Sequence, residues 1–242
     1  MTLQTDHNGL FIRGMTDEEE LKTYLRRKFA QEKIQAAYDR LLHEAKARTA
    51  ADGVSPLQGL WAALDQAFAA KSAALKCGRG CAHCCHTGVS VTQIEWEGIV
   101  NAARKKNIDL NAIIAGAAKS IDRVRQALKS EKNLETVNWH RLVINQPCPF
   151  LDEEQSCVIY EDRPLDCRLV VAFRGACTSK NLEHAQRGVW LEETAAATVI
   201  ARLQHDKTPK FMRRKFKGTQ PIRLLQHWLI LWKEKNKKKR RT

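Results

Sequence analysis

The sequence predicts a mainly α-helical protein in which helices surround one irregular, cysteine-rich segment, with at most a short β-hairpin. Helix start signals followed by apolar residues at helical spacing recur along the 242 residues. Three prolines, Pro147, Pro149 and Pro164, exclude a continuous helix between residues 145 and 168. We find no alternation of strand and helix units, the pattern that would indicate a parallel sheet.

Six helices are expected, near residues 17–48, 55–75, 92–106, 110–128, 182–204 and from Pro221 onward. Ser55 precedes Pro56 as a helix N-cap, and Thr92 and Glu95 form a capping box. Because Asp52-Gly53 interrupts the pattern, we expect the first two helices to form an antiparallel pair. Residues 152–155 are predicted to be the turn of a small hairpin.

The length of the chain favours one compact domain with a substantial core. We expect it to contain three segments, which are a helical pair at 1–75, a cysteine-rich core at 76–180 and C-terminal helices with a basic tail at 181–242. Of the net charge of +14, residues 202–241 carry +13, from 15 Lys or Arg and two acids. Such a basic end is typical of a nucleic-acid or acidic-membrane partner, or simply of a solvated terminus.

The first 20 residues lack the apolar stretch and cleavage site of an export signal. No apolar stretch reaches the roughly 20 residues that a transmembrane helix needs. We therefore expect a cytoplasmic protein. In a reducing compartment, eight clustered cysteines indicate metal or redox chemistry and argue against a disulfide framework.

The cysteines fall into two groups. The first group, Cys77, Cys81, Cys84 and Cys85, lies in one loop that also contains two glycines, and the second group is spread over about 20 residues at Cys148, Cys157 and Cys167. Thiolates packed this closely need a cation to neutralise them, so the first loop predicts a binding site. We expect the second group to fold over it.

The spacing of the first loop favours iron over zinc. Gaps of three and two residues let one short loop present three sulfurs to one face of a cluster. Zinc sites more often use pairs of cysteines separated by two residues. Because neighbouring side chains of an extended segment point to opposite sides, Cys84 and Cys85 are expected to share one ion only if the backbone turns between them.

The combined pattern resembles the YkgJ-type cysteine-cluster family. The matching residues are C-x3-C-x2-C-C at 77–85, Cys148-Pro149-Phe150-Leu151, Cys157-Val158-Ile159-Tyr160, Arg163-Pro164 and Cys167-Arg168. The resemblance covers residues 75–180 and implies a zinc- or iron-chelating role for Cys77, Cys81, Cys84, Cys85, Cys148, Cys157 and Cys167. We expect the cofactor to be an iron–sulfur cluster, with 4Fe-4S favoured, or Zn²⁺, in a structural or redox role. We expect the partner to be an unidentified protein.

Several neighbouring residues have open roles. His83 and His86 are ligands of zinc or hydrogen-bond donors beside the site. Cys177 lies outside the pattern and reads more simply as a buried apolar residue. Arg163 is the candidate cofactor-binding residue, since its charge would offset that of the thiolates. Arg168 is expected to pair with a carboxylate such as Asp166 or Glu161.

Two other functions remain open. The family resemblance extends to flagellin lysine N-methylase, and the three-cysteine spacing matches radical S-adenosylmethionine enzymes, so a protein-modifying enzyme is an alternative. No Gly-rich cofactor strand supports it. The second alternative is a nucleic-acid module at residues 202–241, where Phe211, Phe216, Trp228 and Trp232 alternate with basic residues and could stack on bases. Such aromatic residues are more often the buried face of a terminal helix.

Overall fold

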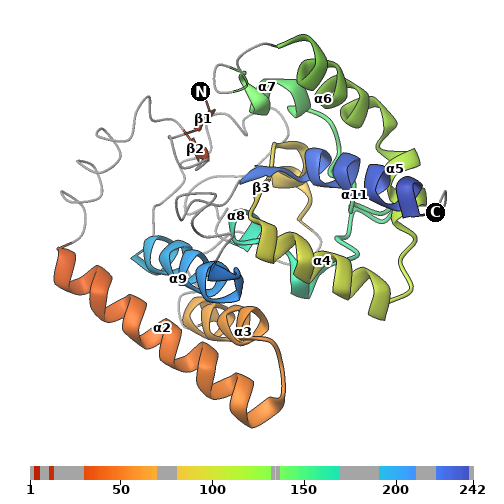
Figure 1. Cartoon of the computed structure of the whole chain (residues 1–242). Coiled ribbons are helices and arrows are strands. Elements are labelled where there is room, and N and C mark those ends of the chain that lie inside the picture. Colours follow the sequence, from red (N-terminus) through yellow and green to blue (C-terminus); the bar gives the residue numbers. More distant parts are fainter. Residues whose placement is uncertain are drawn as a thin grey trace.

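The computed structural model describes residues 3–5, 11–13, 30–69, 81–131, 134, 137–168, 191–210 and 222–239. Helices dominate, which confirms the predicted mainly α class (Figure 1). The helices are α2 (Gln31–Asp52), α3 (Pro56–Ala69), α4 (Gln93–Lys105), α5 (Leu110–Gly116), α6 (Ala118–Ser130), α7 (Trp139–Val143), α8 (Leu165–Arg168), α9 (Leu191–Lys207) and α11 (Leu225–Lys239). Two 3-10 turns are η2 (His83–His86) and η4 (Tyr160–Asp162), and the strands are β1 (Leu3–Thr5), β2 (Phe11–Arg13), β3 (Ser90–Val91) and β4 (Arg223–Leu224).

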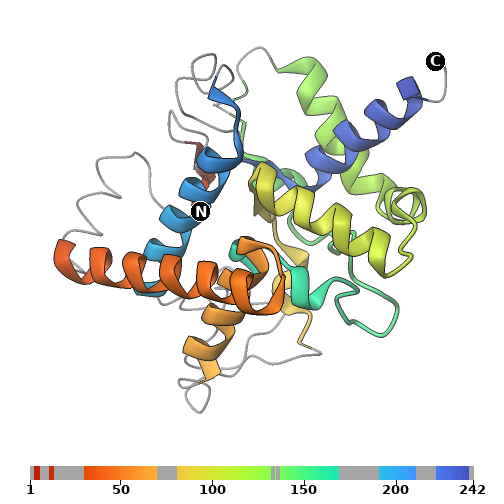
Figure 2. The same ribbon diagram turned by 60° about the horizontal axis from the view of Figure 1, so that its bottom comes forward.

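Helices α2, α3 and α9 form one group and enclose what we name the first core (Figures 1 and 2). Helix α2 ends at Gly53, which has a φ of 65° and donates its N–H to the Thr49 carbonyl, as predicted from Asp52-Gly53. Helix α3 begins at Pro56, also as predicted. At the crossing of α2 and α3, a side chain on Gly59 would meet the Ala45 carbonyl oxygen at 2.5 Å. Glycine therefore allows the close approach of the two helices.

The second group contains α4, α5, α6 and α11 and encloses the second core. Strands β3 and β4 pair antiparallel, Ser90 with Leu224 and Val91 with Arg223, although these partners are 134 and 132 positions apart in sequence. The indoles of Trp96 and Trp228 stack with centroids 6.2 Å apart, and Trp228 Nε1 donates to the Val91 carbonyl at 2.8 Å. These contacts hold the last helix of the chain against α4.

Helix α4 contributes to both cores. Its Ile94 packs in the first core, whereas Trp96 and Ile99 pack in the second. The predicted capping box is present, because the Thr92 hydroxyl accepts from Glu95 N–H while the Glu95 carboxylate accepts from Thr92 N–H. This helix therefore connects the two helical groups.

The structure corrects two of the expected helices, and two further expected stretches concern residues that it does not describe. The helix expected over 110–128 is two helices, which separate at Ala117 directly after Gly116. The last helix begins at Leu225 and not at Pro221, because Arg223 and Leu224 form a strand. The expected helical stretches 17–29 and 182–190 lie outside the described residues.

Across the described ranges, every helix is too short or too polar to traverse a lipid bilayer.

Candidate metal centre

The two cysteine groups meet through the backbone. Cys84 and Cys85 lie in the 3-10 turn η2, where the chain turns sharply between them, which is the condition under which both could face one site. Cys148 N–H donates to the Cys85 carbonyl at 2.6 Å, and Asn145 N–H donates to the His86 carbonyl at 2.9 Å. The second segment therefore lies directly against the turn that carries the first group.

The segment that carries Cys148 and Cys157 contains the predicted hairpin. Leu151 and Cys157 form an antiparallel bridge, and Asp152 N–H donates to the Ser156 carbonyl at 2.9 Å. The Asp152 carboxylate accepts from Ser156 N–H at 2.7 Å, while Gln155 takes a left-handed φ of 60°. The turn at 152–155 is thus confirmed, and it brings Cys157 back alongside Leu151.

Two thiols each accept a backbone hydrogen bond from the residue two positions later. Phe150 N–H donates to the sulfur of Cys148, and Ile159 N–H donates to that of Cys157. Donors aimed at sulfur favour the thiolate form, which is the form that binds metals. This local geometry suits a site where the sulfurs carry negative charge.

Cys167 is positioned by hydrogen bonds of the two residues that precede it. Leu165 N–H donates to Glu95 Oε1 at 2.8 Å, and Ser90 N–H donates to Asp166 Oδ2 at 2.9 Å. Burial raises the pKa of the Glu95 carboxyl, which nevertheless accepts hydrogen bonds from both Thr92 and Leu165. Through these contacts, α4 and β3 fix the short helix α8 that carries Cys167.

Arg168 pairs with a carboxylate, as expected, but the partner is Asp65 of α3, at 2.6 Å, and neither of the two carboxylates given as examples. The guanidinium also donates to the Arg163 carbonyl at 3.0 Å and to the Glu161 carbonyl, and it lies 4.7 Å from the centroid of the Trp61 ring. The sequence could not indicate Asp65, which lies 103 residues away. The buried Arg168 side chain therefore ties the cysteine-rich segment to the first core.

The described thiols influence one another electrostatically. Burial, with smaller contributions from the neighbouring Cys157 and Cys84, raises the pKa of the Cys148 thiol to about 12. Burial also raises the pKa of Cys167 well above its ordinary value, with contributions from Cys148, Cys84 and Cys157. Thus Cys84 lies near Cys148 and Cys167, and burial favours the neutral thiols of Cys148, Cys157 and Cys167 unless a cation is bound.

Positive charge faces this group from Arg163 and Lys106. Burial raises the pKa of the Cys157 thiol, while the charges of Arg163 and Lys106 lower it. The Arg163 guanidinium lies 4.0 Å from the centroid of the Tyr160 ring, and its buried Nε has no hydrogen-bond partner among the described residues. Lys106 also pairs with Glu161 at 2.8 Å. Lys106 was not a predicted site residue, because it is remote in sequence.

The described ranges contain six of the eight cysteines. Cys81, Cys84, Cys85, Cys148, Cys157 and Cys167 are half-buried free cysteines, whereas Cys77 and Cys177 lie outside the described residues. His86 Nδ1 lies 3.2 Å from the Ala82 carbonyl, to which it donates when it carries the proton. Within those ranges, no three His, Cys, Asp or Glu side chains have the arrangement needed to hold a metal ion.

Residues 76–194 match the family model named CxxCxxCC, which is described as "Putative zinc- or iron-chelating domain". Residues 76–194 form a member of this domain family. The CxxCxxCC domain includes both cysteine groups, the hairpin, α4 to α8 and the start of α9. No curated protein and no solved structure matches the chain.

The CxxCxxCC domain supports metal binding by this chain and confirms the cysteine-cluster family expected from the sequence. Glu95 and Asp166 form the hydrogen bonds that position α8, which carries Cys167. The capping box at Thr92 and Glu95 was readable from the sequence, but the second hydrogen bond of Glu95, to Leu165, was not. Only the fold brings these residues together.

Proposed function

We propose that the chain binds an iron–sulfur cluster, of the 4Fe-4S type in preference to others, through its cysteine thiolates. The ligands are drawn from Cys77, Cys81, Cys84, Cys85, Cys148, Cys157 and Cys167, with Arg163 beside the cluster. The observation that carries the proposal is the hydrogen bond between Cys148 N–H and the Cys85 carbonyl, because it joins two cysteine groups that are remote in sequence.

The donor set fits an anionic cluster. Backbone N–H groups point at the sulfurs of Cys148 and Cys157, and hydrogen bonds to sulfur are one of the means by which proteins stabilise and tune such clusters. A buried thiol prefers to keep its proton, so bound metal is needed to maintain several thiolates in this environment. The Arg163 charge beside Cys157 supports the same conclusion.

Iron is preferred to zinc because of the first loop. The gaps of three and two residues between Cys77, Cys81 and Cys84 let one short loop present three sulfurs to one face of a cluster. The family description allows either metal. Zinc is therefore the competing outcome of the experiment, and the cluster, when bound, would give the chain a structural or electron-transfer role.

Anaerobic purification with metal and sulfide analysis tests the proposal. We expect stoichiometric iron and acid-labile sulfide together with visible sulfur-to-iron charge-transfer absorption. Cys148→Ser should lose most of the iron, whereas Cys177→Ser, outside the pattern, should retain it. Colourless protein that holds one equivalent of zinc would replace the cluster by a zinc site, and protein without bound metal would contradict both.

We also propose that the basic segment 202–241 binds an anionic partner. Lys233, Lys235 and Lys237 project from α11, and none of the three has an ion pair within the described part of the chain. Lysines without carboxylate partners favour a bound anion over an internal structural role. The test is binding of a polyanion whose affinity falls steeply with salt concentration, and unchanged binding after removal of residues 233–242 would contradict it.

A further inference from the structure

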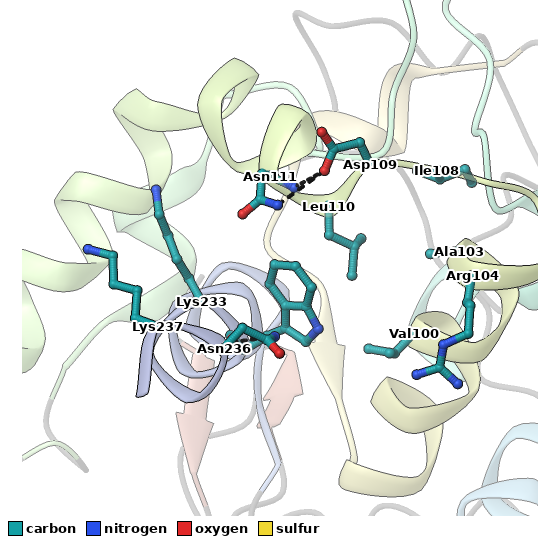
Figure 3. A pocket seen from close by; sticks show the side chains of 11 residues that line it. Val100, Ala103, Arg104, Ile108, Asp109, Leu110, Asn111, Lys233, Asn236 and Lys237 are labelled. Carbon is teal, nitrogen blue, oxygen red and sulfur yellow. Dashed lines mark hydrogen bonds between the residues drawn. The ribbon is translucent and has the colours of Figure 1, made fainter. Parts of the chain in front are cut away.

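A hollow of about 570 Å³ lies between α4, α5 and α11 (Figure 3), and its lining contains none of the described cysteines. Its volume is in the range of pockets that bind small ligands or single groups of larger ones. Val100, Ala103, Ile108, Leu110 and Trp232 give it an apolar wall. The last helix therefore leaves an open apolar space at the surface.

Three cations surround this apolar wall. Arg104 extends from α4, while Lys233 and Lys237 extend from α11 on another side of the hollow (Figure 3). None of them forms an ion pair with any residue that the structure describes. The single acid of the lining, Asp109, accepts from Asn111 N–H at 2.8 Å as the N-cap of α5. The hollow thus combines an apolar interior with unneutralised positive charge.

Of the two tryptophans in α11, Trp232 lines the hollow and can contact a ligand there, whereas Trp228 cannot. Trp228 is 8% exposed, stacks on Trp96 and donates its N–H to the Val91 carbonyl, so it belongs to the second core. Trp232 is only half-buried and lines the hollow. Asn111 and Asn236 add amide groups to the same lining. A planar ring beside amide groups suits a nucleobase, which binds by stacking and by hydrogen bonds at its edge.

The positive charge extends beyond this hollow. Lys233 and Lys237 also line a second hollow, of about 270 Å³, together with Arg125. Along the sequence, residues 233–241 contain seven Lys or Arg and one acid. One phosphate cannot match so long a series of cations, whereas a strand with a phosphate at every nucleotide can. The arrangement therefore favours a polymer over a mononucleotide.

We propose that the hollow between α4, α5 and α11 is a base-binding slot for single-stranded nucleic acid, with one base on Trp232 and phosphates on Lys233 and Lys237. The proposal rests on the anion-binding role proposed above for residues 202–241, and it assigns that role to a specific site. It is independent of the metal centre.

Fluorescence anisotropy of the full-length protein with a labelled uridine decamer tests the slot. We expect Trp232→Leu to weaken binding about 5- to 100-fold without change in the salt slope, because it removes stacking only. Trp232→Phe should keep most of the affinity, and a melting temperature for each variant separates loss of the slot from loss of the fold. Lys233→Gln/Lys237→Gln should lower the slope of log K against log salt by about 1.4, two contacts at about 0.7 each.

The matched control is Lys33→Gln/Lys46→Gln, which removes the same charge from exposed positions of α2. This control should have little effect on the affinity for the decamer or on the slope of log K against log salt. A thymidine decamer that binds equally would support a slot that accepts both RNA and DNA, while tighter binding of the uridine decamer would assign it to RNA.

The outcomes distinguish the slot from the broader anion-binding role. Salt-dependent binding that Trp232→Leu leaves unchanged, or equal binding of poly-glutamate, would overturn the slot and leave the basic segment as the binding region. Competition by adenosine monophosphate at equal affinity would replace the polymer by a mononucleotide and overturn the proposal. No salt-dependent binding of any polyanion would overturn the slot and the anion-binding role together.

Discussion

Single buried charges decide how the cysteine-rich segment is held. The Arg168 residue is 4% exposed. Its guanidinium contacts Asp65 and the Trp61 ring and donates to the carbonyl groups of Glu161 and Arg163. Burial lowers the pKa of its guanidinium, while Asp65 raises it. A charge in such a position is stabilising only as long as its partners remain.

Arg168→Leu is expected to lower the free energy of unfolding by about 3 kcal/mol, because it leaves the Arg163 and Glu161 carbonyls without their donor. Asp65→Asn should cost only about 1 kcal/mol, since the Asp65 side chain is 56% exposed and water can replace part of the pair. Urea unfolding followed by circular dichroism measures both. Equal effects of the two substitutions would show that the ion pair, and not the burial of Arg168, dominates.

His227 is expected to make the protein less stable in acid. Burial, with a contribution from the charge of Arg223, lowers its pKa from 6.5 to about 4, and its ring stacks on Trp139. Between these two values the unfolded chain binds the proton and the folded chain does not, so stability falls as the pH falls. The titration of His227 is expected to lower the free energy of unfolding by about 2 kcal/mol between pH 7 and pH 5.

The measurement compares wild type with His227→Gln by urea unfolding at both pH values, because carboxyl groups titrate in both proteins and cancel in the difference. The wild type should lose about 2 kcal/mol more than the variant between pH 7 and pH 5. An identical loss in the two proteins would mean that His227 already binds its proton in the folded state.

At the scale of elements, helix contacts depend on where small residues allow close approach. Gly59 lies where α3 crosses the backbone of α2, whereas a side chain on Gly116 at the end of α5 would meet nothing within 4 Å. The two glycines are therefore under different constraints, although both lie in helices. Helix propensity alone would favour alanine at both positions.

Gly59→Ala is expected to destabilise the protein by about 1–3 kcal/mol, because the new methyl group forces α2 and α3 apart. Gly116→Ala should raise stability by about 0.5–1 kcal/mol, since it only restricts the unfolded chain. Thermal unfolding followed by circular dichroism gives the direction of both shifts. A stabilising Gly59→Ala would show that the two helices separate at no cost.

At the scale of the whole molecule, two cores meet at α4 and at Arg168. The first core is formed mostly by side chains of α2, α3 and α9. The loops that carry Cys148 and Cys157 pack against the second core. The division into segments 1–75, 76–180 and 181–242 stays a prediction, and α9 packs with the first segment although it belongs to the third.

If the metal supports the loops, its removal should loosen them first. Hydrogen–deuterium exchange of metal-free and metal-loaded protein is expected to show faster exchange over residues 145–168 after removal, with α3 still protected. The reason is that α3 depends on the first core, whereas the 145–168 loops have few regular hydrogen bonds. Uniform acceleration along the chain would show that both cores unfold as one unit.

The sequence by itself determined the mainly α class, the start of α3 at Pro56, the capping box of α4, the hairpin turn and the cysteine pattern. These features depend on residues close together in the chain, where spacing and local chemistry suffice. Only the tertiary structure decided that Asp65 pairs with Arg168, that β3 pairs with β4, that Trp228 is buried while Trp232 lines a hollow, and that Cys148 lies against Cys85. Such contacts join residues dozens to more than a hundred positions apart, and no local preference encodes which of many polar or apolar partners will meet.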